Sequence, residues 1–319
     1  MQESIIGLGM AAIGRPEYIN INVNPILEKT KTKEAFRENA LSLLSEAYES
    51  GIRYFDSAPG YGAAEEFLLE WAKQHPLDSV QFATKWGYTY VADWKANATT
   101  HEVKEHSLSK LNEQWEYSKQ LLPQLNVYQI HSATFESGVL ENKDVLNRLG
   151  ALKKEHNLTI GLTTSGPQQG EVLNLAKDIK FEGDDLFTCY QVTYNVLEQS
   201  TATILKELSD QGKFIVIKEA MANGRIFPET AITKYSSIYT LLNQLANKYQ
   251  VGIDAIAIRF CMDSVHPSVV LSGAFTSSHL QQNLKALNFK LTALEVEELS
   301  TVLSENPDYW FERKQLEWN

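Results

Sequence analysis

Short apolar runs rich in β-branched residues alternate along the chain with longer amphipathic segments. This alternation predicts parallel strands that are connected by helices. The predicted strands are Arg53–Asp56, Val80–Thr84, Val127–Ile130, Thr159–Leu162, Leu186–Val192, Phe214–Lys218 and Ser268–Ser272. The predicted helices are Thr32–Ser50, Ala63–Lys73, Lys104–Leu121, Lys143–His156, Gln168–Lys180, Thr201–Gln211, Tyr239–Tyr249 and Ser277–Leu287.

The beginning of the chain allows two interpretations, because Ile5–Ala11 fits either a first strand or a lid. With that segment counted as a strand, the pattern fits an eight-stranded (β/α)₈ TIM barrel, which is the fold class we predict. An open, doubly wound sheet is the alternative. The 319 residues contain no linker, repeat or low-complexity stretch, so we expect residues 1–319 to form a single domain.

Composition narrows the possible partners. The net charge of −11 argues against a nucleic-acid partner, since phosphate contacts need a basic face, and no polybasic patch favours a membrane surface. The first residues lack the features of a signal peptide, and no run is long enough for a membrane span. Cys189 and Cys261 are far apart in apolar surroundings, so we expect reduced, structural thiols and a cytoplasmic protein.

Two motifs are misleading. Residues Gly7 to Ala12 match a dinucleotide fingerprint, but the following Ile13-Gly14-Arg15-Pro16 is a poor start for the helix that this motif requires. His101 and His106 suggest zinc, but a spacing of five does not place two histidines on one helix face. We interpret the second motif as a solvated helix start and expect no metal site.

Polar residues stand where the predicted strands end. In a barrel the carboxyl ends of the strands meet on one rim, where active sites are built. A single such residue is as easily a cap as a functional group, but a set of them on one rim indicates a site. The set comprises Asp56, Lys85, His131, Thr163, Thr164, Ser165, Gln191 and Lys218.

These side chains suit proton transfer to a carbonyl oxygen. Tyr61 is a candidate proton donor, and an ammonium nearby is expected to lower its pKa from the ordinary value of about 10. Lys85 is the candidate ammonium, and Asp56 can pair with it. His131 can donate a hydrogen bond to the substrate oxygen. The turn from Asp56 to Gly62 fixes Tyr61 relative to Asp56.

With these motifs the chain resembles the aldo-keto reductase superfamily over nearly its whole length. The resemblance rests on Gly51 to Ala58 with Tyr61-Gly62, on Thr84-Lys85, and on Gln129-Ile130-His131-Ser132. It implies the catalytic tetrad Asp56, Tyr61, Lys85 and His131, and an NADP(H) or NAD(H) cofactor lying across the barrel rim. It further implies that Thr163, Ser165 and Gln191 hold the carboxamide, and that Ser272, Gly273, Ala274, Gln282 and Asn283 hold the phosphates and adenine.

Two departures from the family pattern leave the cofactor open. Lys218 stands where many members of the family place a stacking tyrosine. The segment Gly273 to His279 carries only a histidine, where members that select NADPH often carry Arg or Lys. We therefore expect a weaker preference for NADPH over NADH than in those members.

The expected activity is interconversion of small aldehydes or ketones and their alcohols. The alternatives are a sugar (aldose) or secondary-alcohol dehydrogenase that works oxidatively, a cofactor-binding redox-sensing regulatory subunit, and a metal-dependent barrel hydrolase. A carbonyl or sugar substrate would enter past the aromatic loop Trp86–Thr100, where Trp86 and Tyr88 are candidate contacts. These rings, and those of the tail Asp308–Asn319, either line the pocket or pack on the barrel.

Overall fold

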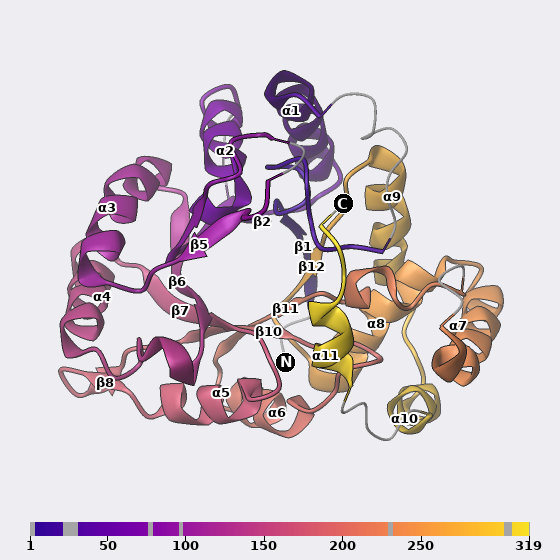
Figure 1. Cartoon of the computed structure of the whole chain (residues 1–319). Helices are drawn as coiled ribbons and strands as arrows, with labels where there is room; N and C mark the ends of the chain where they lie inside the picture. The colour runs from indigo at the N-terminus through magenta and orange to yellow at the C-terminus, as the bar shows by residue number, and fades with distance from the viewer. Residues whose placement is uncertain are drawn as a thin grey trace.

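Eight parallel strands close into a barrel, which confirms the predicted fold class. The computed structural model describes residues 4–21, 31–75, 79–95, 98–228, 232–302 and 308–318. Within these residues the strands follow each other around the barrel in the order β1-β12-β11-β10-β7-β6-β3-β2. Figure 1 shows the ring of strands surrounded by helices.

The barrel strands agree with the predicted strands to within a few residues at each end. The ambiguous first segment is a strand, because Leu8 pairs in parallel with Phe55 on one side and Ser272 on the other. The strands are β1 (Ile5–Gly9), β2 (Tyr54–Asp56), β3 (Gln81–Trp86), β6 (Leu125–Ala133), β7 (Thr159–Thr164), β10 (Cys189–Thr193), β11 (Phe214–Lys218) and β12 (Val269–Ser272).

Helices surround the barrel, and α11 (Tyr309–Lys314) lies at its open end (Figure 1). The α-helices are α1 (Lys33–Glu49), α2 (Ala64–Ala72), α3 (Leu108–Ser118), α4 (Lys143–His156), α5 (Gln169–Lys177), α6 (Ala202–Asp210), α7 (Ser236–Tyr249), α8 (Ile253–Val265), α9 (Ser277–Leu284), α10 (Ala293–Thr301) and α11 (Tyr309–Lys314). Short 3₁₀ helices are η2 (Pro59–Tyr61), η3 (Lys119–Leu121), η4 (Phe135–Ser137), η5 (Ala222–Gly224), η7 (Thr233–Tyr235) and η8 (Lys285–Asn288).

Helix α4 shows how the local sequence sets these boundaries. The Asn142 side chain caps its first turn by accepting a hydrogen bond from the Val145 amide at 3.3 Å. Asn157 ends the helix in the left-handed conformation, with φ of 54°. Between the caps, Val145, Leu149 and Leu152 recur at helical spacing, and all three are buried.

Helix α8 is absent from the sequence prediction. It carries few polar positions, and Ala255 to Ile258, Phe260 to Met262 and Val265 are all buried. An amphipathic pattern requires one solvated face, and a helix buried on nearly all sides lacks this signal. Its place in the structure is between α7 and the edge of the barrel near β12, where α9 and α10 also contact it.

The segment after β3 differs from the prediction. Strand β4 (Tyr88–Tyr90), in the predicted loop Trp86–Thr100, forms an antiparallel hairpin with β5 (Glu102–Lys104), which ends at the first residue of the predicted helix. The predicted helix from Lys104 therefore begins later, at Leu108, where the Ser107 side chain caps it. A second small hairpin, β8 (Lys180–Phe181) with β9 (Asp184–Asp185), precedes β10.

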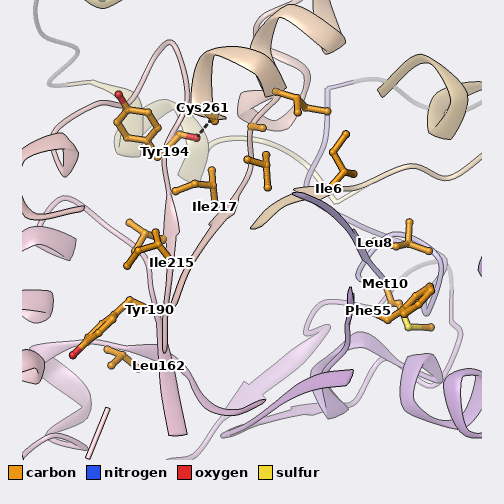
Figure 2. Packing of buried hydrophobic residues seen from close by; sticks show 14 of the residues in the cluster. Ile6, Leu8, Met10, Phe55, Leu162, Tyr190, Tyr194, Ile215, Ile217 and Cys261 are labelled. Atoms are coloured by element: carbon orange, nitrogen blue, oxygen red, sulfur yellow. Dashed lines mark hydrogen bonds between the residues drawn. The ribbon is translucent and has the colours of Figure 1, made fainter. Parts of the chain in front are cut away.

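The apolar core has two layers on opposite sides of the strands. The larger layer lies between strands and helices, and Figure 2 shows part of it around Ile215 and Ile217. The smaller layer consists only of strand residues, which places it inside the barrel. Its buried members are Tyr54, Ala83, Val127, Cys189, Val216, Val269 and Leu271.

Each cysteine belongs to one of these layers. Cys189 lies inside the barrel, and Cys261 on α8 donates to the Tyr194 carbonyl, with Sγ 3.4 Å from the oxygen (Figure 2). Both side chains are free thiols and fully buried, and burial raises the pKa of each. The predicted structural role of both residues agrees with this placement.

We therefore predict that neither thiol reacts with a thiol reagent such as DTNB in the native protein, because the thiolate is the reactive form and both groups are shielded. Two thiols per chain should react once the protein is unfolded in guanidinium chloride. The measurement is the absorbance released with and without denaturant. Rapid labelling of native protein would contradict the buried placement.

Candidate active site

The predicted rim residues lie on the inward face of the barrel because side chains alternate along a strand. Tyr54, Ala83 and Val127 are in the inner apolar layer. Two positions further along β2 and β3, Asp56 and Lys85 face the same interior nearer the carboxyl ends of the strands. On the longer β6, Gln129 and then His131 follow Val127, and on β10 and β11 the same spacing orients Gln191, Thr193 and Lys218.

Lys85 and Asp56 form a buried ion pair at the base of the site. Nζ of Lys85 lies 2.5 Å from Oδ2 of Asp56 and donates to the Ser57 carbonyl at 2.9 Å. The exposed fractions of the two side chains are 0% and 2%. The second carboxylate oxygen, Oδ1, accepts from Gln191 at 2.8 Å and from Gln129 at 3.4 Å. Both charges are therefore paired and further hydrogen-bonded, as a buried ion pair requires.

Tyr61 is the last residue of η2, directly above this pair. Pro59 starts the turn, where its ring presets the backbone, and Gly62 follows with φ of +67°, a conformation that favours glycine. Nζ of Lys85 lies 4.7 Å from the centre of the Tyr61 ring. The hydroxyl lies 3.5 Å from Nε2 of His131, and the two rings are perpendicular. The structure thus brings all four residues of the predicted tetrad together.

The pKa of Tyr61 is raised in this structure, not lowered as expected from the presence of Lys85. Burial raises the pKa of Tyr61 well above 10, and the Asp56 carboxylate raises it further. Lys85 contacts the ring face, and its charge is directed to Asp56. Among the influences on Tyr61, the one that lowers its pKa is Arg15, from the segment after β1. The phenol is therefore protonated at neutral pH.

His131 is neutral in the same surroundings. Burial lowers its pKa well below 6.5, and the positive charges of Lys85, Arg15 and Lys218 lower it further. The Tyr88 ring packs on the imidazole with centres 4.7 Å apart. A neutral imidazole can donate or accept a hydrogen bond without carrying a charge at this position.

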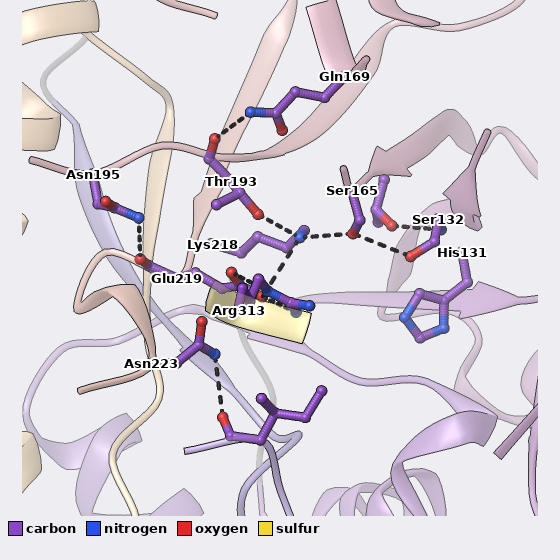
Figure 3. A network of polar contacts seen from close by, with 12 residues as sticks. His131, Ser132, Ser165, Gln169, Thr193, Asn195, Lys218, Glu219, Asn223 and Arg313 are labelled. Atoms are coloured by element: carbon purple, nitrogen blue, oxygen red, sulfur yellow. Dashed lines mark hydrogen bonds and ion pairs between the residues drawn. The ribbon is translucent and has the colours of Figure 1, made fainter. Parts of the chain in front are cut away.

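Lys218 joins a second polar group, which borders the tetrad through Ser165 and Ser132 (Figure 3). Its Nζ donates to Thr193 Oγ1 at 2.7 Å and to Ser165 Oγ at 3.3 Å. Burial lowers the pKa of Lys218 to about 8. The neighbouring Glu219 lies 4.0 Å from Nζ, and its carboxylate is held by both Nε and Nη2 of Arg313 on α11.

Glu219 anchors the C-terminal helix to the rim. Although burial opposes ionisation, Arg313 and Lys218 lower the pKa of Glu219 to about 2. Asn195 donates both to the Glu219 carbonyl, at 2.9 Å, and to the Tyr309 hydroxyl, at 3.0 Å. Tyr309 is fully buried. Within the aromatic tail, Tyr309 thus packs on the barrel whereas Phe311 is exposed, and α11 lies at the open end (Figure 1).

The predicted cofactor residues occupy two regions. Thr163 accepts from the Ser132 amide at 2.8 Å, and Ser165 lies between Ser132 and Lys218, so these residues border the tetrad. Ser272 and Asn283 are bonded to each other at 2.8 Å, between β12 and α9. Gly273 and Ala274 follow Ser272, and Gln282 precedes Asn283. Gln191 differs, because its amide nitrogen is already committed to Asp56.

The two predicted aromatic contacts have different surroundings. Trp86 faces the outer layer, where it is fully buried and its ring packs on His106. Tyr88 is partly exposed, and packing on His131 places it at the site. Burial raises the pKa of Tyr88 to about 12. Of the two residues, Tyr88 is the one positioned to meet a substrate.

The sequence predicted a solvated helix start at the histidine motif, and this prediction is wrong. His101 stacks on Trp318, with ring centres 4.5 Å apart, and its Nδ1 lies 2.9 Å from a Glu17 carboxylate oxygen. His106 bonds to the His131 carbonyl at 2.9 Å. In the part of the chain that the structure describes, no group of three or more His, Cys, Asp or Glu side chains is arranged to hold a metal ion.

None of the helices among the described residues has the length and apolar character that a membrane span requires.

Sequence reasoning missed four charged residues at the rim: Arg15, Glu102, Glu219 and Arg313. Each contacts a partner far away in the sequence, as in Arg15 with Glu102 and Glu219 with Arg313. Arg15 lies in the segment Ile13-Gly14-Arg15-Pro16, whose poor helix start argued against a dinucleotide-binding motif. No other feature of the sequence marked Arg15 as a site residue.

The fold and this site define an α/β-barrel protein whose reactive groups are gathered at the carboxyl ends of the strands. The model of the aldo/keto reductase family matches residues 6–304. The chain belongs to this family of oxidoreductases that act on carbonyls and alcohols.

Individual relatives are distant. Norsolorinic acid reductase B of Dothistroma septosporum is 24% identical over 301 residues, covering 85% of this chain and 74% of its own length. The solved glycerol dehydrogenase of Gluconobacter oxydans is similar with a TM-score of 0.71, at 17% identity and with 96% and 94% of the two chains covered. An aldo-keto reductase of Bacillus halodurans, solved in its holo form, has a TM-score of 0.68 at 17% identity, covering 97% and 96%. The two structures support the fold.

The buried ion pair leads to a prediction about stability. Lys85→Met should lower the free energy of unfolding by about 3–5 kcal/mol, because it leaves the Asp56 carboxylate buried without its cation. Adding Asp56→Asn to that variant should recover part of the loss, since the unpaired charge is then removed. The measurement is the midpoint of urea unfolding, followed by tryptophan fluorescence, for both variants and the wild type. Equal midpoints for Lys85→Met and the wild type would contradict the buried pairing.

Proposed function

We propose that the protein transfers a hydride between a nicotinamide cofactor and a small aldehyde or ketone, with Tyr61 as the proton donor. One observation carries the proposal: the Tyr61 hydroxyl and His131 Nε2 lie 3.5 Å apart, above the buried Lys85–Asp56 pair. Two hydrogen-bonding groups at this separation can hold one carbonyl oxygen between them. A bound nicotinamide would supply the hydride.

Tyr61 and His131 have different roles because they differ in protonation. His131 is uncharged because its pKa lies well below 6.5, so it can orient the carbonyl oxygen by a hydrogen bond. Tyr61 holds its proton because its pKa lies well above 10. When the carbonyl carbon accepts a hydride, the oxygen becomes a strongly basic alkoxide, and the phenolic proton moves to it. Because Tyr61 holds its proton, it is available as the acid in carbonyl reduction.

The rim also suits the proposed cofactor. Near the tetrad, the polar group of Lys218, Ser165 and Thr193 offers hydrogen bonds to an amide. Across the barrel, Gly273 is exposed, and nothing lies within 4 Å of where its Cβ would stand. Helix α9 starts just beyond it, and a helix start favours phosphate. Ser272, Gly273, Ala274, Gln282 and Asn283 would hold the dinucleotide there.

A second candidate is an alcohol dehydrogenase that acts on polyols or sugars. Two ion pairs at the rim favour it, Arg15 with Glu102 and Arg313 with Glu219, because their partly exposed members, Glu102 and Arg313, can bind hydroxyl groups. The name of the Gluconobacter relative, glycerol dehydrogenase, agrees with this chemistry. A redox-sensing subunit remains the alternative to an enzyme, and turnover distinguishes it.

The test of the proposal is Tyr61→Phe. This variant should lose about 10²–10⁴-fold in kcat for carbonyl reduction, because positioned proton transfer contributes that much. Binding of NADPH, followed by tryptophan fluorescence, should stay unchanged. The matched control is Tyr128→Phe, since Tyr128 faces the outer layer from the same strand as His131 and its buried hydroxyl has no partner among the described residues. Wild-type turnover in Tyr61→Phe would show that the assignment is wrong.

Cofactor choice is governed by the cations near α9. Arg225 is buried and committed to the Ala222 and Tyr309 carbonyls, so it is unavailable to a 2′-phosphate. His279 is exposed on α9, and Lys285 directly follows that helix. Both interact with Asp254, and burial raises the pKa of that carboxyl.

We predict a weak preference for NADPH over NADH, because no arginine accompanies His279 and Lys285 at α9. Dissociation constants for NADPH and NADH provide the measurement, with Lys285→Ala as the variant. A strong preference that is lost in Lys285→Ala would contradict the prediction and assign the phosphate to Lys285.

A further inference from the structure

The segment after β1 is fixed against the turn that carries Tyr61. The Ala63 amide donates to the Gly14 carbonyl at 2.8 Å. A Cβ on Gly14 would stand 2.2 Å from the Tyr61 carbonyl oxygen, and one on Gly62 would stand 2.4 Å from the Gly14 oxygen. Both glycines are thus required for backbones to approach this closely. The next residue, Arg15, consequently has a defined place beside Tyr61.

The Arg15 guanidinium bridges two elements around Tyr61. Nη1 donates to the Gly60 carbonyl at 2.7 Å and to Glu102 Oε2, on β5, also at 2.7 Å. Cζ lies 5.6 Å from the centre of the Tyr61 ring, and the Trp318 ring lies 4.7 Å from Cζ. Only 3% of the Arg15 side chain is exposed. The cation is therefore held at the proton donor and shielded from solvent.

Glu102 engages only part of this guanidinium. Nε of Arg15 is buried and has no hydrogen-bond partner among the residues that the structure describes. A carboxylate can take an arginine with two parallel hydrogen bonds, but Glu102 contacts Nη1 alone. Glu102 is also partly exposed, at 24%, so solvent screens its charge more than that of Arg15.

We propose that Arg15 is a positioning residue for proton transfer, which holds the Tyr61 turn through Gly60 and stabilises the phenolate, with Glu102 as its opposing charge. The proposal rests on the proposed role of Tyr61. A proton donor becomes an anion when it has given up its proton, so a fixed cation beside it lowers the energy of that state.

The charged groups around Tyr61 support opposite roles for Arg15 and Glu102. After burial, Asp56 on β2 raises its pKa, Arg15 lowers it, and Glu102 and Glu219 raise it. The other titratable groups near the ring are Lys85 on β3, His131 on β6, Tyr18 after β1 and Tyr88 on β4. Arg15 and Glu102 therefore act on the same proton in opposite directions, although they are bonded to each other.

The test compares the opposite effects of Arg15 and Glu102 on the rate of alcohol oxidation. Tyr61 must then be a phenolate, and below its pKa the fraction of phenolate rises about tenfold with each pH unit. We would measure kcat/KM from pH 6 to pH 9 with NADP⁺ and either glycerol or benzyl alcohol. At a fixed pH, Arg15→Gln should be about tenfold slower, because it removes a nearby cation. Glu102→Gln should be about threefold faster, because it removes a partly screened anion.

Three further variants separate the proposal from its alternatives. Arg15→Lys should keep the rate near that of the wild type at every pH, since the charge remains. The double variant Arg15→Gln with Glu102→Gln should lie between the two single variants. If Glu102→Gln loses activity as Arg15→Gln does, or if Arg15→Lys is as slow as Arg15→Gln, Arg15 is merely structural and the proposal is wrong. If Tyr61→Phe oxidises alcohol at the wild-type rate, or the wild type oxidises neither alcohol, the proposed function itself fails.

Discussion

The site depends on one buried ion pair, Lys85 with Asp56. Two charges inside a barrel are costly to remove from water, and their attraction offsets that cost only when the remaining hydrogen bonds are made. Here they are made, by the Ser57 carbonyl on one side and by Gln191 and Gln129 on the other. The pair occupies the interior above the apolar layer, so the ring of Tyr61 can pack on a rigid, charged base.

Much of this arrangement could be predicted from the sequence because it follows from local rules. Strands that alternate with helices must form a parallel sheet, and a period of two along each strand orients Asp56, Lys85 and His131 inward. The distance of Tyr61 from Asp56 is set by a single short turn. The positions of these residues can be predicted without any distant contact other than the closure of the barrel.

What could not be predicted depends on contacts between distant segments. Arg15 meets Glu102 only because the β4–β5 hairpin folds over the turn of Tyr61, and that hairpin was interpreted as a loop and a helix start. Glu219 meets Arg313 only because the C-terminal helix returns to the rim. The raised pKa of Tyr61 could not be predicted for the same reason. It results mainly from burial, and segments that are distant in the sequence together bury the ring.

These distant contacts also set the electrostatics of the rim. The protein is acidic overall, with a net charge of −11, yet the described residues place the cations Arg15, Lys85, Lys218 and Arg313 at the site. Arg15, Lys85 and Arg313 each have a carboxylate within hydrogen-bonding distance. Lys218 is different, because Glu219 lies 4.0 Å away and already binds Arg313, and its nearest partners are the uncharged hydroxyls of Thr193 and Ser165. The residual positive charge is therefore at Lys218. A dinucleotide is an anion, and a local cation in a low-dielectric rim attracts it more strongly than the distant surface charge repels it.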